Sequence, residues 1–450
     1  MIKLLFLIIY ILMLTLYCRS TFDKFLLTPQ FGVCIGFLIS TVGLLFRYQR
    51  WDADISIQSI TIIIIGLTVM VGTSVIMQKM LGIKNKLKRI EMPINDVKES
   101  DLLLEKWKVV FWTFIQIVSL IFVIRFLISN GGTKSLQSSI NTYRRQIYIT
   151  GDAVSLPIIT RIVRSICIAS GYMFEYLLAH RLVYGDNKRL TVLYLINILL
   201  PMISLTIVGG SRGGIMQCLI SEIVIWFILY TYKTGKSVSI KNSMVVLLLA
   251  ILFLNIFAQL SDVLGRGVVK KEDDTVMVYL SSSILNFDTY LHRFPTNDNK
   301  NYTLSTLINL MYEITGNKDL EYTDPIGSVY QSRKGCYLGN VYTTFQPFYH
   351  DGKMLGVILY SALVGIIGQI LLYYSTIKYK VNKVSISIIL YSYMYFSFFH
   401  LFYSNKVFPQ LLTDTFFKMA IFLVLIKTFF FKMKFVTNSS IKRSVLKERA

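Results

Sequence analysis

Residues 190–230 read LTVLYLINILLPMISLTIVGGSRGGIMQCLISEIVIWFILY, two long apolar runs joined by a short glycine-rich tip. The runs, about 190–208 and 215–230, are each long enough to cross a bilayer, so they predict a membrane-spanning hairpin. Four glycines surround Ser211 and Arg212 at its tip. Glycine lets a bulky group approach the backbone closely, and an arginine at a bilayer is costly unless it meets an anion or a group of carbonyls. The tip is therefore either a phosphate-binding site at the membrane surface or a tight turn whose arginine anchors to lipid headgroups.

The composition extends this prediction to the whole chain. Hydrophobic residues make up 54% of the 450 residues and charged residues 16%, and the mean hydropathy is +0.56. Soluble domains carry about 25% charged residues, so we predict an all-α polytopic integral membrane protein with about 11–12 transmembrane helices. The first run is expected to be a retained anchor, because no small-residue cleavage site follows it. Eleven apolar runs are near or above spanning length: 2–18, 31–46, 55–80, 109–129, 157–178, 190–208, 215–230, 244–260, 354–375, 384–401 and 414–431.

Lysines and arginines indicate how these helices are oriented. If successive helices cross the membrane in opposite directions, five connecting segments lie on the same side. These are 81–108, 180–189, 231–243, 376–383 and the tail from 432, which hold 7, 3, 3, 3 and 6 basic residues respectively. The positive-inside rule makes that side cytoplasmic. The N-terminus would then lie outside, unless a re-entrant segment within 55–80 brings it back inside.

A large segment between two apolar runs divides the chain into four parts. We expect an N-terminal transmembrane bundle of about eight helices over 1–260, an external loop over 261–353, C-terminal transmembrane helices over 354–431 and a basic cytoplasmic tail over 432–450. The loop is far longer than ordinary connections, which indicates a functional or a disordered segment. Its stretches 276–291 and 302–314 are amphipathic and could lie on the membrane face. Its recurring tyrosines and phenylalanines suit carbohydrate, although ordinary packing and an interfacial aromatic belt explain them as well.

Several functional classes are disfavoured. The net charge of +22 comes largely from the predicted cytoplasmic segments, where it faces anionic lipid. No basic segment carries the interleaved aromatics of a nucleic-acid-binding module. The five cysteines are scattered, no Cys or His pair has metal-ligand spacing, and the phosphate-binding loop and nucleophile-elbow motifs are absent. We therefore expect no nucleic-acid partner, no metal site and no cofactor.

Arginines within the apolar runs are a second indication of an anionic ligand. Arg161, Arg164 and Glu175 fall within about 60° of one another on one predicted helix, so this stripe should face the protein interior or a water-filled cavity. For a single arginine, snorkelling to the headgroups is the simpler explanation. For a set of them we favour a shared pyrophosphate, which the guanidinium fork grips bidentately. Five arginines from four helical regions reach the predicted outer level of the membrane: Arg125, Arg161, Arg164, Arg212 and Arg266.

Two motifs resemble one family of membrane enzymes. The Gly-Ser-Arg-Gly-Gly hairpin, the large external loop, and GNVYTTFQPFYHDG over 339–352 resemble the Wzy-type O-antigen polymerases, also described as oligosaccharide repeat-unit polymerases. The resemblance covers the layout of nearly the whole chain, but specific residues mainly in these two motifs. His350 is a departure, because the family pattern suggests an acidic or other polar residue there.

The resemblance implies a glycosyltransferase of lipopolysaccharide or related surface-polysaccharide biosynthesis, in the bacterial inner membrane with its active site facing the periplasm. A growing glycan on undecaprenyl pyrophosphate would be transferred from its reducing end to the non-reducing end of a new lipid-linked repeat unit. The lipid pyrophosphate would leave. The implied partners are undecaprenyl-pyrophosphate-linked glycans, membrane lipids and a chain-length regulator protein.

The donor pyrophosphate would be held by positive charge, which also stabilises the charge that develops on it as the glycosidic bond breaks. We assign Arg212 and Arg266 to this catalytic role. Arg161, Arg164 and Ser211 are expected to bind the substrate.

The acceptor hydroxyl would need a base. Asp351 and His350 are the best placed in sequence, at the foot of the helix that follows the loop. The alternative for Asp351 is a polar cap of that helix, since an aspartate is favoured at a helix N-terminus. Asn340, Tyr342 and Tyr349 are expected to contact the glycan.

Other functions remain open on the sequence. An O-antigen ligase would share the architecture and the arginines and would differ in its acceptor, the lipid A core. A lipid-linked oligosaccharide flippase should show internal repeats and short loops, and neither is visible here. A non-enzymatic scaffold would explain the loop but not the intramembrane arginines.

Overall fold

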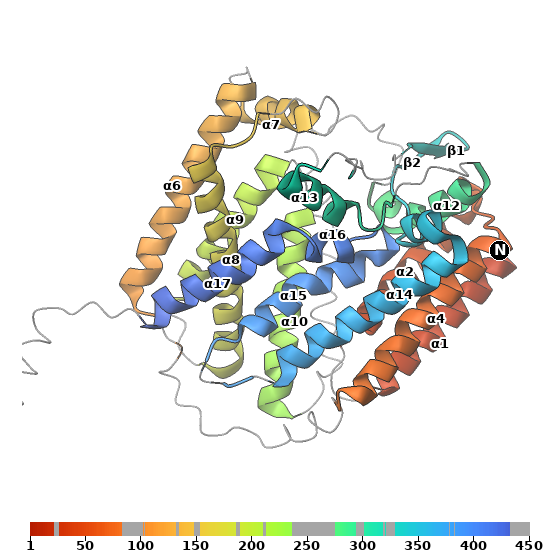
Figure 1. The fold of residues 1–450 in the computed structure, drawn as a ribbon, viewed down its shortest axis with the longest axis horizontal. Helices are drawn as coiled ribbons and strands as arrows, with labels where there is room; N and C mark the ends of the chain where they lie inside the picture. Colours follow the sequence, from red (N-terminus) through yellow and green to blue (C-terminus); the bar gives the residue numbers. More distant parts are fainter. Residues whose placement is uncertain are drawn as a thin grey trace, which may run out of the picture.

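The structure is a computed structural model that describes residues 1–21, 27–82, 102, 104–131, 135–147, 154–185, 190–209, 213–235, 275–293, 301–317, 320, 329–377, 379–381 and 383–432. The helices of the first half are α1 (Ile2–Thr21), α2 (Pro29–Phe46), α3 (Tyr48–Trp51), α4 (Ile57–Met80), α6 (Lys106–Gly131), α7 (Leu136–Arg145), α8 (Ile158–Tyr184), α9 (Thr191–Gly209) and α10 (Gly213–Thr234). Those of the second half are α12 (Thr275–Arg293), α13 (Ser305–Thr315), α14 (Phe345–Ile377), α15 (Ile386–Phe399), the short 3₁₀ helix η4 (His400–Phe402), α16 (Val407–Leu411) and α17 (Asp414–Lys432). Between them lies an antiparallel hairpin of β1 (Gln331–Arg333) and β2 (Cys336–Gly339) (Figure 1).

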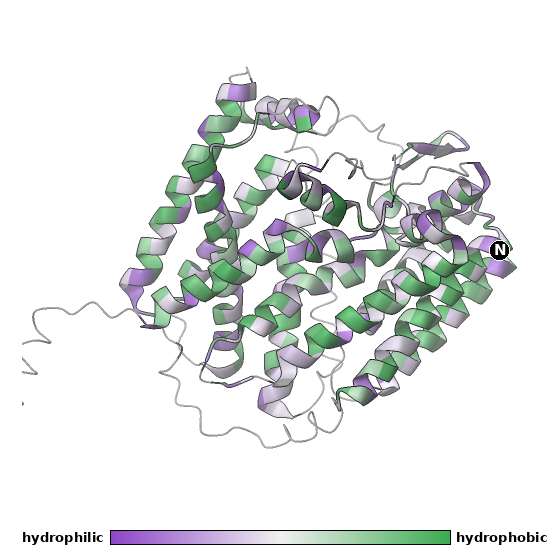
Figure 2. Cartoon of the chain, viewed as in Figure 1, coloured by the Kyte–Doolittle hydropathy of each residue, from purple (hydrophilic) through white to green (hydrophobic). Residues whose placement is uncertain are grey.

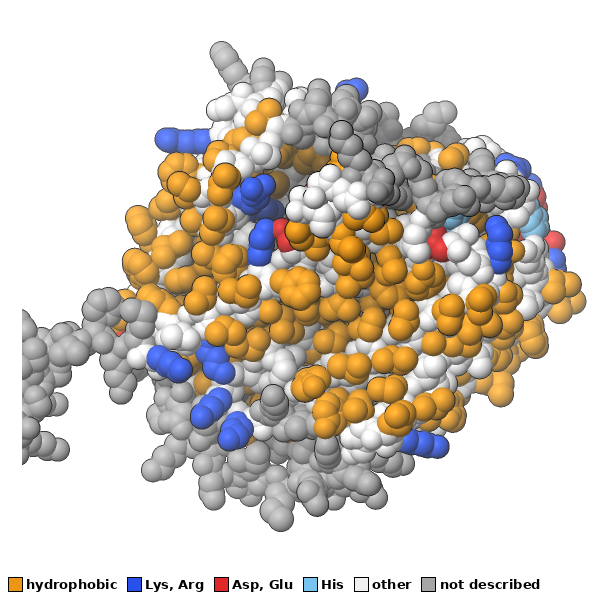
Figure 3. Space-filling model, in the orientation of Figure 1, with side chains coloured by type: hydrophobic (Ala, Val, Ile, Leu, Met, Phe, Trp, Pro, Cys, Tyr) orange, Lys and Arg blue, Asp and Glu red, His pale blue; other side chains and the backbone are white. Residues whose placement is uncertain are grey.

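The chain is an all-α polytopic membrane protein, as its composition predicts. Eight of the described helices are long and apolar enough to cross a membrane. Hydrophobic residues run along them, whereas hydrophilic residues concentrate in α7, in the β1–β2 hairpin and at helix ends (Figure 2). The space-filling view shows the result as a broad apolar belt across the molecule (Figure 3). Every predicted apolar run is a helix except 244–260, which lies outside the described residues.

The N-terminus lies on the same face as the hairpin. The Met1 amino group donates to the Tyr48 hydroxyl over 2.6 Å, and the Arg333 guanidinium of β1 donates to the Asp52 carbonyl over 2.9 Å. We call this the hairpin face. Helix α4 is one continuous helix of 24 residues. The possibility of a re-entrant segment within 55–80 is therefore wrong.

The opposite face carries basic helix ends. Helices α4, α8, α10 and α17 all run away from the hairpin face (Figure 1). A cation in the last turn also interacts favourably with the negative end of a helix dipole. The last turns of these four helices contain Lys79, Arg181, Lys233 and Lys432.

Small residues let α4 and α14 pack closely. A Cβ at Gly365 of α14 would lie 2.5 Å from the Met70 carbonyl oxygen of α4 and closer still to the Thr73 hydroxyl. On α4, Gly66 faces the Phe345 ring in the same way. Glycine at such positions brings two membrane helices into van der Waals contact, which is the main attraction between helices in lipid.

Replacing Gly365 with alanine is expected to destabilise the protein by about 1–3 kcal/mol, because the added methyl meets a backbone oxygen that cannot move aside. Gly72 of the neighbouring α4 is the matched control, since a Cβ there has no atom within 4 Å. Gly72→Ala should be neutral or stabilising by up to about 1 kcal/mol, because alanine is the better helix former. Thermal unfolding of the detergent-purified variants, followed by tryptophan fluorescence, measures the difference. Equal melting temperatures for both variants would contradict this account of the α4–α14 contact.

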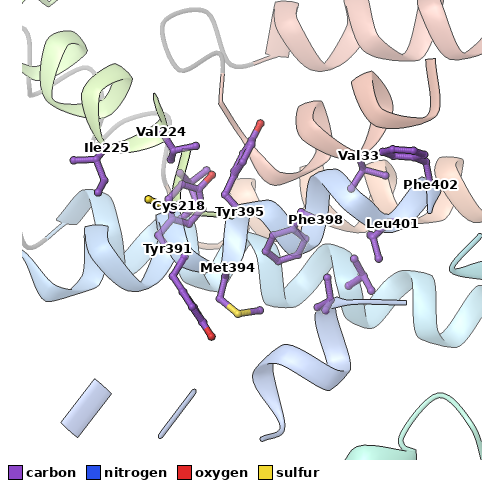
Figure 4. Packing of buried hydrophobic residues seen from close by; sticks show 14 of the residues in the cluster. Val33, Cys218, Val224, Ile225, Tyr391, Met394, Tyr395, Phe398, Leu401 and Phe402 are labelled. Atoms are coloured by element: carbon purple, nitrogen blue, oxygen red, sulfur yellow. The ribbon is translucent and has the colours of Figure 1, made fainter. Parts of the chain in front are cut away.

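The short helix α15 lies in the centre of the bundle. Figure 4 shows its side chains packed among those of α10 and α2. Tyr391, Met394 and Phe398 of α15 are all fully buried. A helix that is hydrophobic all round is a core helix, so the predicted run 384–401 is enclosed by protein.

The expectation that 276–291 lies on the membrane surface is wrong. This segment forms α12, whose residues 281–290 are all buried. Several polar side chains of this helix hydrogen-bond to other parts of the protein. The Asn286 side-chain amide donates to the Leu338 and Val341 carbonyls over 3.1 and 2.9 Å. Polar residues along α12 therefore mark contacts with the hairpin and not a water-facing surface.

A short helix that was not predicted precedes the helix expected after the loop. The expected boundary at 353–354 falls inside α14, which starts at Phe345 and is kinked at Gly352 and Lys353. Lys353 has a φ of 50°. The kink directs the first turns of α14 differently from its long membrane-spanning part.

Candidate functional site

Arg161 and Arg164 lie one turn apart near the start of α8, at the hairpin face. Arg161 is exposed and Arg164 is half-buried, and the buried Nε of Arg164 has no hydrogen-bond partner. Within the described parts of the chain, neither arginine forms an ion pair with an acidic residue. Two like charges on adjacent turns disfavour a helix, and an arginine at membrane depth favours an anion. This end of α8 is therefore a place where an anionic group would be stabilised.

Helix α7 supports this end of α8. The Tyr143 hydroxyl of α7 donates to the Val154 carbonyl over 2.9 Å, just before α8 begins. Burial raises the pKa of Tyr143, and the Arg164 charge opposes that rise in part. Tyr143 thus stays protonated at neutral pH and gives Arg164 a neutral neighbour, so it does not compensate the charge of the arginine.

The stripe of Arg161, Arg164 and Glu175 faces the protein interior only at its Glu175 end. The first turns of α8 lie at the surface, whereas residues 169–181 are all buried. Arg125 of α6 is exposed. The expectation of an inward-facing stripe is therefore wrong for Arg161, because α8 enters the bundle only after its first two turns.

The glycine-rich tip joins α9 to α10. Ser211 and Arg212 lie outside the described residues, as does Arg266. Because α8, α9 and α10 pack against one another and alternate in direction, the end of α9 and the start of α10 lie on the same face as Arg161. One glycine of the tip has a packing role. A Cβ at Gly214 would lie 2.9 Å from Leu205 Cγ of α9.

Asp351 ties the start of α14 to the turn before α13. Its side chain is buried, and its two oxygens accept the backbone amides of Tyr302 and Thr303 over 2.9 and 2.8 Å. The His350 Nδ1 lies 3.4 Å from Asp351 Oδ1, and the Tyr302 ring meets the imidazole edge-on at 4.6 Å. Asp351 therefore ends the short first part of α14, directly before the kink and the long membrane-spanning part that the sequence predicts from 354. It caps a neighbouring turn and orients the imidazole.

The three predicted glycan contacts lie close together in sequence but differ in exposure. Tyr342 is buried, and its hydroxyl donates to the Val329 carbonyl over 2.7 Å and accepts from Gln331 over 3.0 Å. Burial also raises the pKa of Tyr342. Asn340 and Tyr349 are half-buried. Tyr342 thus anchors the hairpin, while the other two remain at its edge.

Tyr349 also joins the hairpin face to α4. Its hydroxyl accepts from the Gln58 side-chain amide over 3.1 Å, and the Lys353 ammonium lies 5.4 Å from the centre of its ring. Such a cation over an aromatic face is attractive. Tyr349 therefore presents a half-buried ring beside a positive charge, next to His350.

Sequence reasoning missed Asp288 of α12. Its Oδ1 accepts the Ser56 amide and the Ser59 hydroxyl over 2.8 and 2.7 Å, and its Oδ2 lies 3.7 Å from the Arg333 guanidinium. The carboxylate thereby joins α4, α12 and the hairpin. No local signal could have found it, because Ser59 lies 229 residues away in sequence.

A polar turn after α15 was missed as well. The Asn405 amide donates to the Thr303 carbonyl over 3.2 Å, so this turn lies on the segment that Asp351 holds. His400 begins the turn. It is half-buried among rings, including those of Phe396 at 4.4 Å and Tyr403 at 5.2 Å. A histidine at the end of an apolar run is the signal that could have drawn attention to it.

The hairpin face therefore combines a cationic helix end, which no described acidic residue pairs with, and a polar layer built from the starts of α13 and α14 and the turn after α15. Among the described residues, no group of three or more His, Cys, Asp or Glu side chains could hold a metal ion. Comparison of the chain with protein-family models, curated proteins and solved structures finds no match.

Proposed function

We propose that this protein is a membrane glycosyltransferase that polymerises oligosaccharide repeat units carried on undecaprenyl pyrophosphate into O-antigen or a related surface polysaccharide. The observation that carries the proposal is the start of α8, where Arg161 and Arg164 have no acidic partner among the described residues. A membrane protein that keeps two guanidinium groups uncompensated at the edge of its apolar belt is suited to an anionic lipid ligand. Arg212 and Arg266 would complete the set.

The donor would lie with its pyrophosphate against these arginines. Bidentate hydrogen bonds would position the two phosphates, and the fixed positive charge would stabilise the charge that grows on the leaving pyrophosphate. Ser211 would contribute a hydroxyl. The half-buried Arg164 is best suited to this role, because electrostatic interactions strengthen as water is excluded.

The acceptor hydroxyl would lose its proton to His350. Asp351 holds the imidazole from one side at 3.4 Å and is itself fixed by two backbone amides. A base oriented by a third, anchored group is the usual arrangement for general-base catalysis. Asn340 and Tyr349 would contact the sugar at the edge of this site, and Tyr342 would support them by holding the hairpin.

We place the protein in the bacterial inner membrane with the hairpin face in the periplasm. The support is the series of basic last turns at the opposite face, which is the distribution expected for cytoplasmic helix ends. Undecaprenyl-pyrophosphate-linked glycans would then reach the arginines from the outer leaflet, and a chain-length regulator would meet the same face.

Deletion of the gene tests the proposal directly. We expect the surface polysaccharide to change from a ladder to core carrying a single repeat unit, because attachment continues while polymerisation stops. Electrophoresis of the extracted polysaccharide measures this, with the wild-type gene supplied in trans as the control. Loss of every repeat unit would indicate a ligase or a flippase instead, and an unchanged ladder would reject all three functions.

A further inference from the structure

Two glutamates lie inside the membrane-spanning bundle, away from the site described above. Glu175 is near the middle of α8, and Glu222 is near the middle of α10. The two helices pack against each other, and Glu222 lies within electrostatic reach of Glu175. Cys218, one turn before Glu222, interacts with both carboxyl groups. Charged residues this deep in a bilayer are rare and are usually functional.

Three of the four carboxyl oxygens are buried without a hydrogen-bond partner. Glu175 is 0% exposed, and neither of its oxygens has a hydrogen-bond partner. Glu222 is half-buried, and its Oε2 is the oxygen that is buried without a partner. Their polar neighbours on α10 are satisfied by α15: Gln217 donates to the Tyr393 carbonyl over 3.1 Å and Ser221 donates to the Ser392 hydroxyl over 3.0 Å. Around the pair, the buried oxygens without a partner are therefore those of the carboxyl groups and the Tyr172 hydroxyl of α8.

No cation compensates the pair within the described residues. The titratable groups that interact with it are Tyr172 of α8, Cys218 of α10 and, through Tyr172, Tyr393 of α15. All of these are neutral in their protonated forms. Two carboxylates close together in a medium of low dielectric cannot both stay ionised, so at least one must hold a proton.

We propose that Glu175 and Glu222 form a proton-binding site in the middle of the membrane, which takes up and releases one proton as a pair. A proton needs a single oxygen, whereas a metal cation needs several ligands. In the described part of the chain, Glu175, Glu222 and Cys218 do not form a group that could hold a metal ion. This site is separate from the arginines at the hairpin face, and it does not depend on the glycosyltransferase proposal.

The test uses dicyclohexylcarbodiimide, an apolar reagent that reaches carboxyl groups within membranes. The protonated carboxyl gives its proton to a carbodiimide nitrogen while its oxygen adds to the central carbon. The acyl group of this O-acylisourea then migrates to nitrogen, so the side chain gains one whole carbodiimide and nothing leaves. Peptide mass spectrometry of the purified full-length protein locates the adduct.

We expect an adduct on Glu175 or Glu222 that falls at least tenfold between about pH 6 and pH 9, because the reaction needs the proton and the pair loses it as pH rises. In Glu175→Gln, the labelling of Glu222 should decline at lower pH than in the wild type, because the like charge that favoured protonation is gone. A permanently protonated structural pair would show no such shift. Glu313→Gln, which changes an exposed carboxyl of α13, should leave the labelling curve unchanged.

Three outcomes would overturn the assignment. The first is the absence of any adduct on either glutamate in the folded wild-type protein. The second is labelling that does not vary with pH, which would mean a permanently protonated structural pair. The third is protection by Na⁺ at constant pH, which would make the ligand a metal cation. The wild-type measurement needs no variant, so a folding defect in Glu175→Gln cannot hide these outcomes.

Discussion

Replacing Arg164 with lysine is expected to reduce polymer formation about 10- to 100-fold while the protein level stays unchanged. Lysine keeps the positive charge but loses the fork that binds two phosphate oxygens at once. A charge-assisted hydrogen bond contributes about 1.5–3 kcal/mol, and each 1.36 kcal/mol is tenfold in rate. The variant should fold, because no described residue forms an ion pair with Arg164. Transfer of lipid-linked repeat units by the purified protein in vesicles measures the effect.

Arg125→Lys is the matched control for this experiment. Arg125 lies on α6 and is exposed, so the same substitution there should change polymer formation by less than about twofold. Arg161→Lys should fall between the two, because Arg161 is exposed but one turn from Arg164. Wild-type activity in Arg164→Lys would mean that Arg164 only anchors α8 to lipid headgroups.

Replacing Asp351 with alanine is expected to destabilise the protein by about 2–4 kcal/mol and to lower its level in the membrane. The change leaves the amides of Tyr302 and Thr303 without their acceptor, and an unsatisfied buried donor costs about 1–3 kcal/mol. It also removes the group that orients His350. Thermal unfolding in detergent gives the stability, and polymer formation per folded molecule gives the activity.

The outcome separates the anchoring and catalytic contributions of Asp351. Asp54→Ala is the control, because its side chain is 59% exposed and Lys3 is its ion-pair partner among the described residues, so its loss should cost less than about 1 kcal/mol. His350→Ala should retain most of the stability and lose most of the activity. An Asp351→Ala protein with normal stability would contradict the anchoring role, and a His350→Ala protein with normal activity would exclude that histidine as the base.

The apolar runs predicted the membrane helices well, because spanning length and hydropathy are local properties. For example, the ends of α9 and α10 lie close to the ends of the two apolar runs, 190–208 and 215–230, that were predicted on either side of Arg212. The amphipathic stretch 276–291 was misread for the opposite reason. Its polar residues pair with the hairpin and with α4, and nothing in the segment itself distinguishes a protein partner from water. The short first part of α14 was not predicted either. The stretch GNVYTTFQPFYHDG contains turn-forming and helix-forming residues side by side, so its sequence does not show where a helix begins.

The candidate site was only partly predictable. The arginines of α8 stand out because arginine is rare in apolar segments. Their difference in exposure was not predictable, because it depends on where α8 enters the bundle. Tyr342 was expected to contact the glycan because it is one of the recurring aromatic residues of the loop. Its hydroxyl instead hydrogen-bonds to Val329 and Gln331 within the protein. Asp288 was invisible, because its hydrogen-bond partners come from the other end of the chain.

By itself, the sequence determined the class of this protein, the position of most of its helices and the presence of costly charges within them. These follow from hydropathy and charge, which act residue by residue. Only the tertiary structure decided that α12 is buried, that Asp351 anchors a turn, and that Glu175 lies within electrostatic reach of Glu222. Each of these depends on contact between segments distant in sequence, and such contacts are set by packing and by the need to satisfy every buried polar group.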